Sequence, residues 1–281
     1  MNFIIFGGFM KKITVAICYD FDNTLSVMDM QNFSFIPNLG LTPAEFWSRA
    51  NEFGKANKMD GVSTYLKFMI DLCKEKDIKL TRDYLVSLGK DVKYFNGVTT
   101  WFDRINKYAK SKDINLEHYI ISSGNKEIIE GTEIFHEFKE VFGSEYLYNE
   151  EGIAYWPKTM INYTQKTQYL FRISKGAYDM SDDQKVNERI KRHHVEFRNM
   201  IYMGDGITDV PCLTLIKEKG GSSISIYKPG TKYKSDKLIN EDRVNYACVG
   251  DFSEGSQVEV LTKLIIDSIS TREKLLHKNY K

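Results

Sequence analysis

The sequence predicts an α/β fold, namely a Rossmann-like, doubly wound and mainly parallel sheet that carries an inserted helical cap. Short apolar runs rich in β-branched residues, such as residues 13–19, end in polar turns, as strands buried on both faces do. Other segments place apolar residues at helical spacing. The chain has 281 residues, 42% of them hydrophobic, which suits one α/β domain with an insertion better than two independent domains.

Two aspartates, Asp20 and Asp22, follow directly on the first of these runs. Ligands of open α/β sheets bind just outside the carboxyl ends of the strands, so two carboxylates at that edge indicate a site. Aspartate and asparagine are also ordinary turn residues, and a solvated turn explains this segment equally well by itself. The rest of the chain has to decide between the two interpretations.

A second polar segment ends the short strand of residues 118–125. It contains Ser122, Ser123 and Gly124 and leads into a periodic segment over residues 126–142, which predicts a helix. Hydroxyls and free N–H groups at a helix start suit an anion, although the same residues also serve simply as a helix cap.

Two more segments follow the same plan. Lys166 lies near the start of a helix that we expect to end at Gly176, and residues 200–209 combine a strand, a tight turn and the acid pair Asp205 and Asp209. Each has a plain structural explanation, as a surface lysine or a glycine turn. Their occurrence in this order favours a functional site.

Residues 29–94 form a long insertion whose patterning is mostly helical. Residues 42–45 combine an N-cap threonine, a proline at the first helical position and a glutamate that completes a capping box. We therefore expect one helical cap domain over residues 29–94, while residues 10–28 and 95–281 form the α/β core.

The remaining elements belong to the core. A helix begins at Gly97, residues 145–155 predict a small hairpin, and residues 223–227 and 244–249 predict two strands. Apolar positions at helical spacing predict a packed helix over residues 256–276.

Composition excludes some classes of function. Lys and Arg total 39 against 38 Asp and Glu, so no basic surplus indicates a nucleic-acid partner. The four cysteines are far apart and lack metal-type spacing, which indicates buried thiols in a reducing cytoplasm.

The apolar residues 1–10 lack the usual layout of a targeting segment, and we expect that they are not one. No positive charge precedes them, and they are far shorter than the roughly 20 residues of a membrane span, so we expect no membrane partner. Met10 is a plausible natural start, and we expect residues 1–9 to add little to function.

In their order and local context, the polar segments resemble the haloacid dehalogenase superfamily of hydrolases. Its four motifs are DxDxT, a strand-terminal Ser or Thr, a Lys, and a glycine-flanked Asp pair, which here are residues 20–24, Ser122, Lys166 and residues 204–209. The dehalogenases of the superfamily lack the second aspartate of the first motif. Asp22 therefore points to the phosphoryl-transfer branch.

The resemblance implies a phosphatase that hydrolyses a small phosphomonoester through an aspartyl-phosphate, with Mg²⁺ as cofactor. Asp20 would be the nucleophile, Asp22 the acid and base, and Lys166 would hold both the phosphate and the nucleophile. Thr24 would donate a hydrogen bond within its own loop. The implied phosphate-binding residues are Thr24, Ser122, Ser123, Gly124 and Lys166, and the implied metal ligands are Asp20, the Asp22 carbonyl, Asp205 and, through the outer shell, Asp209.

The chemistry explains these residue types. A phosphomonoester is a dianion, and a carboxylate cannot approach its phosphorus unless cations and N–H donors screen the repulsion. Mg²⁺, which prefers oxygen ligands, and a lysine ammonium supply that screening.

The substrate stays open. Phosphoserine phosphatases are similar in general layout, but they usually have Asn where this chain has Thr208, and Glu where it has Asp29. We interpret Asp29 as a flexible surface residue, the commoner role of aspartate, although contact with a substrate ammonium is the alternative.

Two other functions remain open as well. One is a phosphotransferase or phosphomutase of the same superfamily, and the other is a non-catalytic scaffold that binds a phosphorylated ligand. The partner in the favoured case is a small phosphorylated metabolite. The sequence makes no prediction of oligomeric state.

Overall fold

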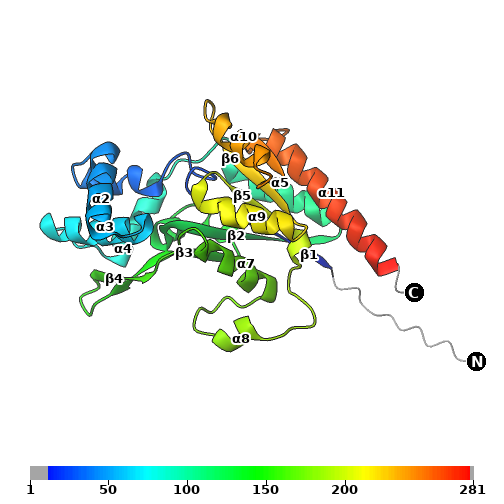
Figure 1. Ribbon diagram of the computed structural model, residues 1–281, viewed down its shortest axis with the longest axis horizontal. Coiled ribbons are helices and arrows are strands. Elements are labelled where there is room, and N and C mark those ends of the chain that lie inside the picture. The colour runs from blue at the N-terminus through cyan, green and yellow to red at the C-terminus, as the bar shows by residue number, and fades with distance from the viewer. Residues whose placement is uncertain (1–11, 279–281) are drawn as a thin grey trace, which may run out of the picture.

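A computed structural model describes residues 12–278, and its core is a seven-stranded sheet with helices on both faces (Figure 1). The strand order is β4-β3-β2-β1-β5-β6-β7, and each neighbouring pair is parallel except β3 and β4. The predicted α/β, doubly wound and mainly parallel fold is confirmed. The strands are β1 (Ile13–Tyr19), β2 (Ile114–Asn125), β3 (Glu140–Tyr148), β4 (Ala154–Thr159), β5 (Met200–Gly204), β6 (Ser222–Tyr227) and β7 (Tyr246–Val249).

Strand β1 lies at the point where the strand order reverses. The chain adds β2, β3 and β4 on one side of β1, and later adds β5, β6 and β7 on the other. The loops after β1, β2 and β5 therefore leave the same edge of the sheet in different directions. In doubly wound sheets this edge is where ligands bind.

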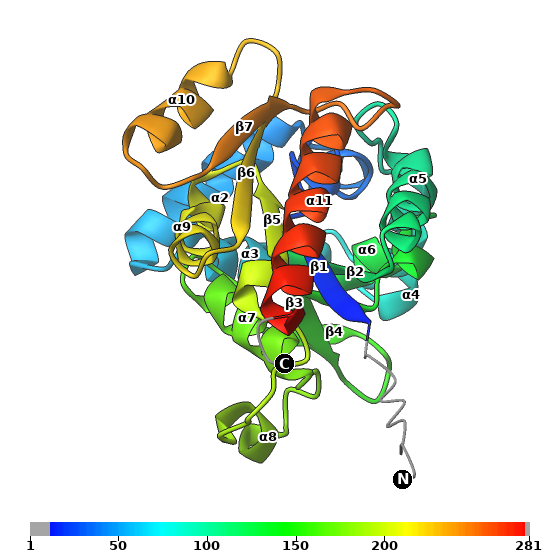
Figure 2. The same ribbon diagram turned by 90° about the vertical axis from the view of Figure 1, so that its right-hand side faces the viewer.

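The two faces of the sheet are covered by separate sets of helices (Figure 2). Side chains alternate along β1, so Val15 and Ile17 pack with α5 and α11, whereas Ala16 and Cys18 pack with α7 and α9. This double burial explains the near-continuous apolar run of the strand. The helices of the core are α5 (Val98–Ser111), α6 (Lys126–Glu130), α7 (Gln165–Lys175), α8 (Asp183–Asn187), α9 (Val210–Glu218), α10 (Lys232–Asn240) and α11 (Gln257–Lys278).

The insertion after β1 is helical, and it lies at one end of the sheet (Figure 1). The Thr42 side chain accepts the Glu45 N–H while Glu45 accepts the Thr42 N–H, so the predicted capping box is present. We propose residues 29–94 as a cap, and we use that name for them below. Its helices are α1 (Phe35–Asn38), α2 (Pro43–Asn57), α3 (Gly61–Glu75) and α4 (Arg82–Leu88).

The cap and the sheet share one hydrophobic cluster. Phe46 and Leu66 of the cap belong to the same cluster of buried side chains as Val15 and Ile17 of β1. The hairpin of β3 and β4 also supports the cap, because the Tyr146 hydroxyl donates to the Leu66 carbonyl oxygen over 2.9 Å. The cap is therefore packed continuously onto the core.

Two segments differ from the sequence predictions. The helix expected over residues 126–142 ends at Glu130. The next residue, Gly131, packs against α4 so closely that a Cβ would lie 1.7 Å from the Val86 carbonyl oxygen, and only glycine allows this approach. Residues 140–148 are then strand β3. The expected hairpin is present around Gly152, but its strands are longer and extend the main sheet.

The other core predictions are confirmed. The helices predicted from Gly97 and over residues 256–276 are α5 and α11, α7 ends at Gly176, and the two later strands are β6 and β7. All four cysteines are buried and free. Among the described residues, no helix has the length and apolar character needed to cross a membrane. The predictions for residues 1–9 and for Met10 lie outside the described part of the chain.

Candidate active site

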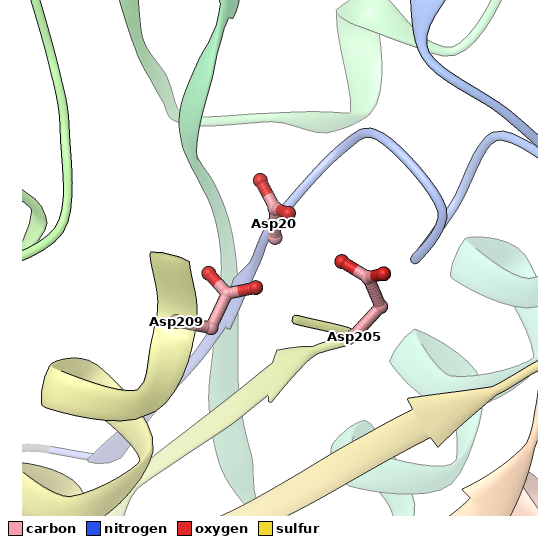
Figure 3. A group of neighbouring side chains, drawn as sticks. All are labelled: Asp20, Asp205 and Asp209. Atoms are coloured by element: carbon pink, nitrogen blue, oxygen red, sulfur yellow. The ribbon is translucent and has the colours of Figure 1, made fainter. Parts of the chain in front are cut away.

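Three carboxylates from distant parts of the sequence meet at the carboxyl edge of the sheet (Figure 3). Asp20 follows β1, and Asp205 and Asp209 follow β5. One oxygen of each side chain lies within 4.8 Å of an oxygen of the other two. This spacing allows the three groups to lie around one divalent cation.

Lys166 supplies the positive charge of the cluster. Its side chain is fully buried, and Nζ lies 2.9 Å from Asp20 Oδ1 and 2.7 Å from Asp209 Oδ1. The Tyr202 hydroxyl donates to the same Asp209 oxygen over 2.7 Å, and the Gly206 N–H donates to Oδ2 over 3.4 Å. Both oxygens of Asp209 are therefore occupied by protein donors.

One ammonium does not balance the carboxylates. Burial and the Asp209 charge raise the pKa of Asp20 despite Lys166, and burial with the charges of Asp209 and Asp20 raises the pKa of Asp205. Burial alone would lower the pKa of Lys166, but Asp20 and Asp209 outweigh it and raise that pKa. The described structure contains no hydrogen bond to the Asp205 carboxylate. This excess of negative charge fits a divalent cation with oxygen ligands.

Asp22 lies beside this cluster in a different environment. Its Oδ1 accepts the Met30 N–H over 2.8 Å. Burial and the charges of Asp29 and Asp20 raise the pKa of Asp22. Because a backbone donor already occupies Oδ1, a proton on this carboxyl group belongs on Oδ2.

The loop after β2 brings polar groups up to the aspartates. Ser122 Oγ is fully buried and accepts the Gly124 N–H over 3.0 Å, which leaves its O–H able to donate elsewhere. A Cβ on Gly124 would lie 2.8 Å from Asp22 Oδ2, so this approach requires glycine. Ser123 Oγ and Thr24 Oγ1 are buried without a partner among the described residues, so the local hydrogen bond expected of Thr24 is not made.

A cavity of about 150 Å³ opens onto Asp20 and Asp22. The interpretation of Asp29 as a surface residue is wrong, because Asp29 lines this cavity. Sequence reasoning missed the role of three more lining residues from the cap, because two of them have a helical spacing that predicted only packing and the third belongs to no periodic pattern. These additional lining residues are Gln31, Trp47 and Tyr65.

The structure thus brings together the residues that the sequence singled out. Asp20, Asp22, Ser122, Ser123 and Gly124 line one cavity. The Lys166 ammonium contacts both Asp20 and Asp209, and Asp205 completes the carboxylate group. Such an arrangement can hold a metal ion and a phosphoryl group against a buried carboxylate.

The model of haloacid dehalogenase-like hydrolases matches residues 17–214. A protein of Borreliella burgdorferi described only as uncharacterized is 26% identical over 275 residues, which cover 88% of this chain and 92% of that protein.

Solved structures share the fold at low sequence identity. A HAD-family hydrolase from Salmonella enterica serovar Typhi matches with a TM-score of 0.59 and 16% identity, over 89% of this chain and 70% of that chain. A substrate-bound phosphoserine phosphatase matches with a TM-score of 0.57 and 12% identity, over 90% of this chain and 99% of that chain. These similarities concern the fold alone.

Proposed function

The chain belongs to the haloacid dehalogenase-like hydrolases, and we propose that it is a Mg²⁺-dependent phosphatase that hydrolyses a small phosphomonoester through an aspartyl-phosphate on Asp20. One observation carries this proposal. The buried Asp20 carboxylate lies 2.9 Å from the ammonium of Lys166 and borders a cavity that is also lined by Ser123, whose buried hydroxyl has no hydrogen-bond partner among the described residues. A carboxylate held in this way can approach a phosphate dianion.

In this mechanism Asp20 attacks phosphorus and forms a covalent intermediate, which divides one difficult displacement into two easier ones. Lys166 remains protonated, because two carboxylates raise its pKa, and it offsets the charge of the phosphoryl oxygens. Ser122 donates its O–H to a phosphoryl oxygen, while Ser123, Gly124 and Thr24 offer further donors in the same loops.

Asp22 moves the proton. With Oδ1 fixed by the Met30 N–H, Oδ2 carries the proton that the departing alcohol receives. The same oxygen then accepts a proton from the water that attacks the phosphoenzyme. Burial and nearby charges raise the pKa of Asp22, which supports its role as the acid of the first step.

A divalent cation, which we propose to be Mg²⁺, would neutralise charge on the phosphoryl group when bound. Asp20, the main-chain carbonyl of Asp22 and Asp205 would hold it. Asp209 would act through the outer shell, because both of its oxygens already accept hydrogen bonds from protein donors.

We place this reaction on a small phosphorylated metabolite in the cytoplasm. The buried free thiols and the small cavity support this setting, and the near-neutral net charge supports a partner other than nucleic acid. The same site is compatible with two alternative functions. One is transfer of the phosphoryl group to a second substrate, and the other is binding of a phosphorylated ligand without catalysis.

The test is a screen of phosphomonoesters with Mg²⁺ present or chelated, using the wild type and Asp20→Asn. We expect release of inorganic phosphate that requires both the metal and Asp20. Phosphate recovered on a second metabolite would favour the phosphotransferase, and ligand binding without turnover would favour the scaffold. Undiminished turnover by Asp20→Asn would exclude the phosphoaspartate.

A further inference from the structure

We propose that Asn23 is a positioning residue for the metal site, and that Lys228 and Asp29 hold its side chain from two sides. Asn23 fixes the peptide that carries the Asp22 carbonyl oxygen, one of the groups that would hold the cation. This inference rests on the proposed function, because it concerns the divalent cation of the proposed reaction.

The backbone of Asn23 has an uncommon conformation. Its φ is 60°, in the left-handed region that residues other than glycine seldom adopt. Four other described residues except glycine share a positive φ, and each lies at the carboxyl end of a helix, where this conformation is a common cap. These four residues are Lys58, Asp77, Asp113 and Asp242. Asn23 caps no helix, so other contacts have to hold its conformation.

This conformation sets the direction of the neighbouring carbonyl group. The Asp22 carbonyl belongs to the planar peptide that joins Asp22 to Asn23, and rotation about φ of Asn23 turns that peptide against the rest of the loop. The preceding carbonyl, that of Phe21, accepts the N–H groups of Leu25 and Ser26 over 2.9 and 3.0 Å. No backbone N–H among the described residues donates to the Asp22 carbonyl oxygen. Its lone pairs therefore remain available to a cation.

The side chain of Asn23 is held at both of its polar atoms. Lys228 Nζ donates to Asn23 Oδ1 over 2.5 Å, and Asn23 Nδ2 donates to Asp29 Oδ1 over 2.9 Å. Both hydrogen bonds involve a charged group, and such bonds are stronger than those between neutral groups. The charges also fix the orientation of the amide, because its oxygen meets the ammonium and its nitrogen meets the carboxylate.

The two charged groups come from different parts of the fold. Lys228 follows β6, and its backbone is fixed because its N–H donates to Thr231 Oγ1 over 3.1 Å while that hydroxyl donates to the Lys228 carbonyl oxygen over 2.9 Å. Asp29 begins the cap. Neither Lys228 nor Asp29 forms an ion pair within 4.0 Å in the described part of the chain, so no other charge competes for these hydrogen bonds. Asn23 thus joins the core, the loop after β1 and the cap at one point.

Removal of Lys228 distinguishes positioning from a simple effect of charge. An ammonium near a cation site repels the cation, so loss of this charge should strengthen metal binding if Lys228 acts only through its charge. If Lys228 holds Asn23 in place, its loss should weaken metal binding instead. The two roles therefore predict changes of opposite sign.

The test measures Mn²⁺ binding by calorimetry on the full chain without substrate, since Mn²⁺ prefers the same oxygen ligands as Mg²⁺. We expect Asn23→Ala to raise the dissociation constant roughly tenfold or more, the usual loss when a group that orients a metal ligand is removed. Asn23→Gly also loses both hydrogen bonds but tolerates a positive φ, so it replaces Asn23→Ala should that variant not fold.

Lys228→Met should also raise the dissociation constant of Mn²⁺, by about threefold or more, because the Asn23 amide is then held at one end only. Lys228→Arg, which keeps the charge and the N–H donors, should restore much of the wild-type affinity. Lys232→Met is the matched control, since it removes a charge from the start of α10, where the side chain is 63% exposed, and it should bind Mn²⁺ as the wild type does. Unchanged or tighter binding in Lys228→Met would overturn the proposal.

A double variant tests whether Lys228 acts through Asn23. In a protein that already carries Asn23→Ala, Lys228→Met should no longer weaken Mn²⁺ binding, because the hydrogen bond between the two side chains is already lost. Equal losses with and without Asn23→Ala would contradict an action through Asn23.

The outcome also separates this inference from the proposed function. Mn²⁺ binding that Asn23→Ala and Asn23→Gly leave unchanged would overturn only the inference. The expected changes in Mn²⁺ binding, without hydrolysis of any phosphomonoester, would overturn only the proposed function. Asp205→Asn should abolish Mn²⁺ binding, and undiminished binding in that variant, or no binding to the wild type, would overturn the proposed metal site and the inference with it.

Discussion

Tyr19 and Asp20 are neighbours at the end of β1, but their side chains enter two buried polar networks of opposite kind. The Tyr19 hydroxyl accepts the Trp101 indole N–H over 2.8 Å and lies 3.0 Å from His118 Nδ1. His118 Nε2 lies 2.9 Å from Asn106 Oδ1, and burial lowers the pKa of His118 to about 3. This network is neutral, and the polar side-chain atoms of Tyr19, Trp101 and His118 all have partners.

The Asp20 network is charged and incomplete. It holds three carboxylates against one ammonium, and burial with mutual repulsion raises the pKa of Asp20 and of Asp205. Neutral, satisfied networks stabilise a core, whereas unbalanced charges cost stability and persist where chemistry requires them. The comparison predicts that the two networks respond in opposite ways to mutation and to pH.

The largest effect is expected for Asp20→Asn. Without the nucleophile, kcat should fall by about 10⁴-fold or more, as for nucleophiles of other covalent enzymes. In EDTA the same change should raise Tm by about 2–4 °C, the effect of about 1 kcal/mol in a protein of this size, because it removes a destabilising charge.

Phosphate release and thermal unfolding measure the two effects of this substitution. Asp103→Asn is the control, since Asp103 is exposed and, among the described residues, pairs only with Lys107 across one helical turn. A lower Tm in Asp20→Asn than in the wild type under EDTA would contradict the view that the charged carboxylate cluster lowers the stability of the folded protein.

Lys166→Met should have the largest effect on stability. It leaves Asp20 and Asp209 buried without their cation, which typically costs about 3–5 kcal/mol when one partner of a buried ion pair is removed. Urea unfolding measures this loss. Lys107→Met, on the exposed side of α5, should change the free energy of unfolding by less than about 0.5 kcal/mol.

Asp22→Asn tests the proton transfer by comparing leaving groups. For an alkyl phosphate we expect kcat/KM to fall by about 10²–10⁴-fold, since the alkoxide needs a proton. For p-nitrophenyl phosphate the loss should be much smaller, because that leaving group departs without one. Equal losses for both esters would remove the role of Asp22 as the acid.

The sequence predicted the charged network better than the residues that surround it. Asp20, Asp205 and Lys166 could be found because each follows a strand or begins a helix. All three then lie at the edge of the sheet where the parallel strands end. These signals are local, and the topology of the sheet brings them together.

The cap side of the cavity could not be predicted in this way. Trp47 and Tyr65 have the helical spacing of packing residues, and which of them borders a cavity depends on how α2 and α3 lie against the sheet. Asp29 and Gln31 precede the first cap helix without any periodic pattern. The contact of Gly131 with α4, which follows the early end of a predicted helix, is likewise tertiary.

The smallest effect is the change of folding stability with pH. The two networks contribute to this change with opposite signs. The pKa of His118 is lowered in the folded protein, so the unfolded chain binds the extra proton and stability falls as the pH drops below about 6.5. Between pH 6.5 and 5 this amounts to roughly 2 kcal/mol. The pKa of Asp20 is raised to about 7, so the folded protein binds the extra proton. The stability therefore rises as the pH falls below about 7.

Urea unfolding in EDTA at pH 7, 6 and 5 separates the two contributions. His118→Gln should reduce the loss of stability on acidification, because it removes the group that must stay neutral when folded. Asp20→Asn should increase that loss, because it removes the opposing gain. The side chain of His136 is 75% exposed, so His136→Gln should show the same dependence of stability on pH as the wild type. If His118→Gln and Asp20→Asn shifted the profile in the same direction, the two networks would not differ in the way that their charges and hydrogen bonds indicate.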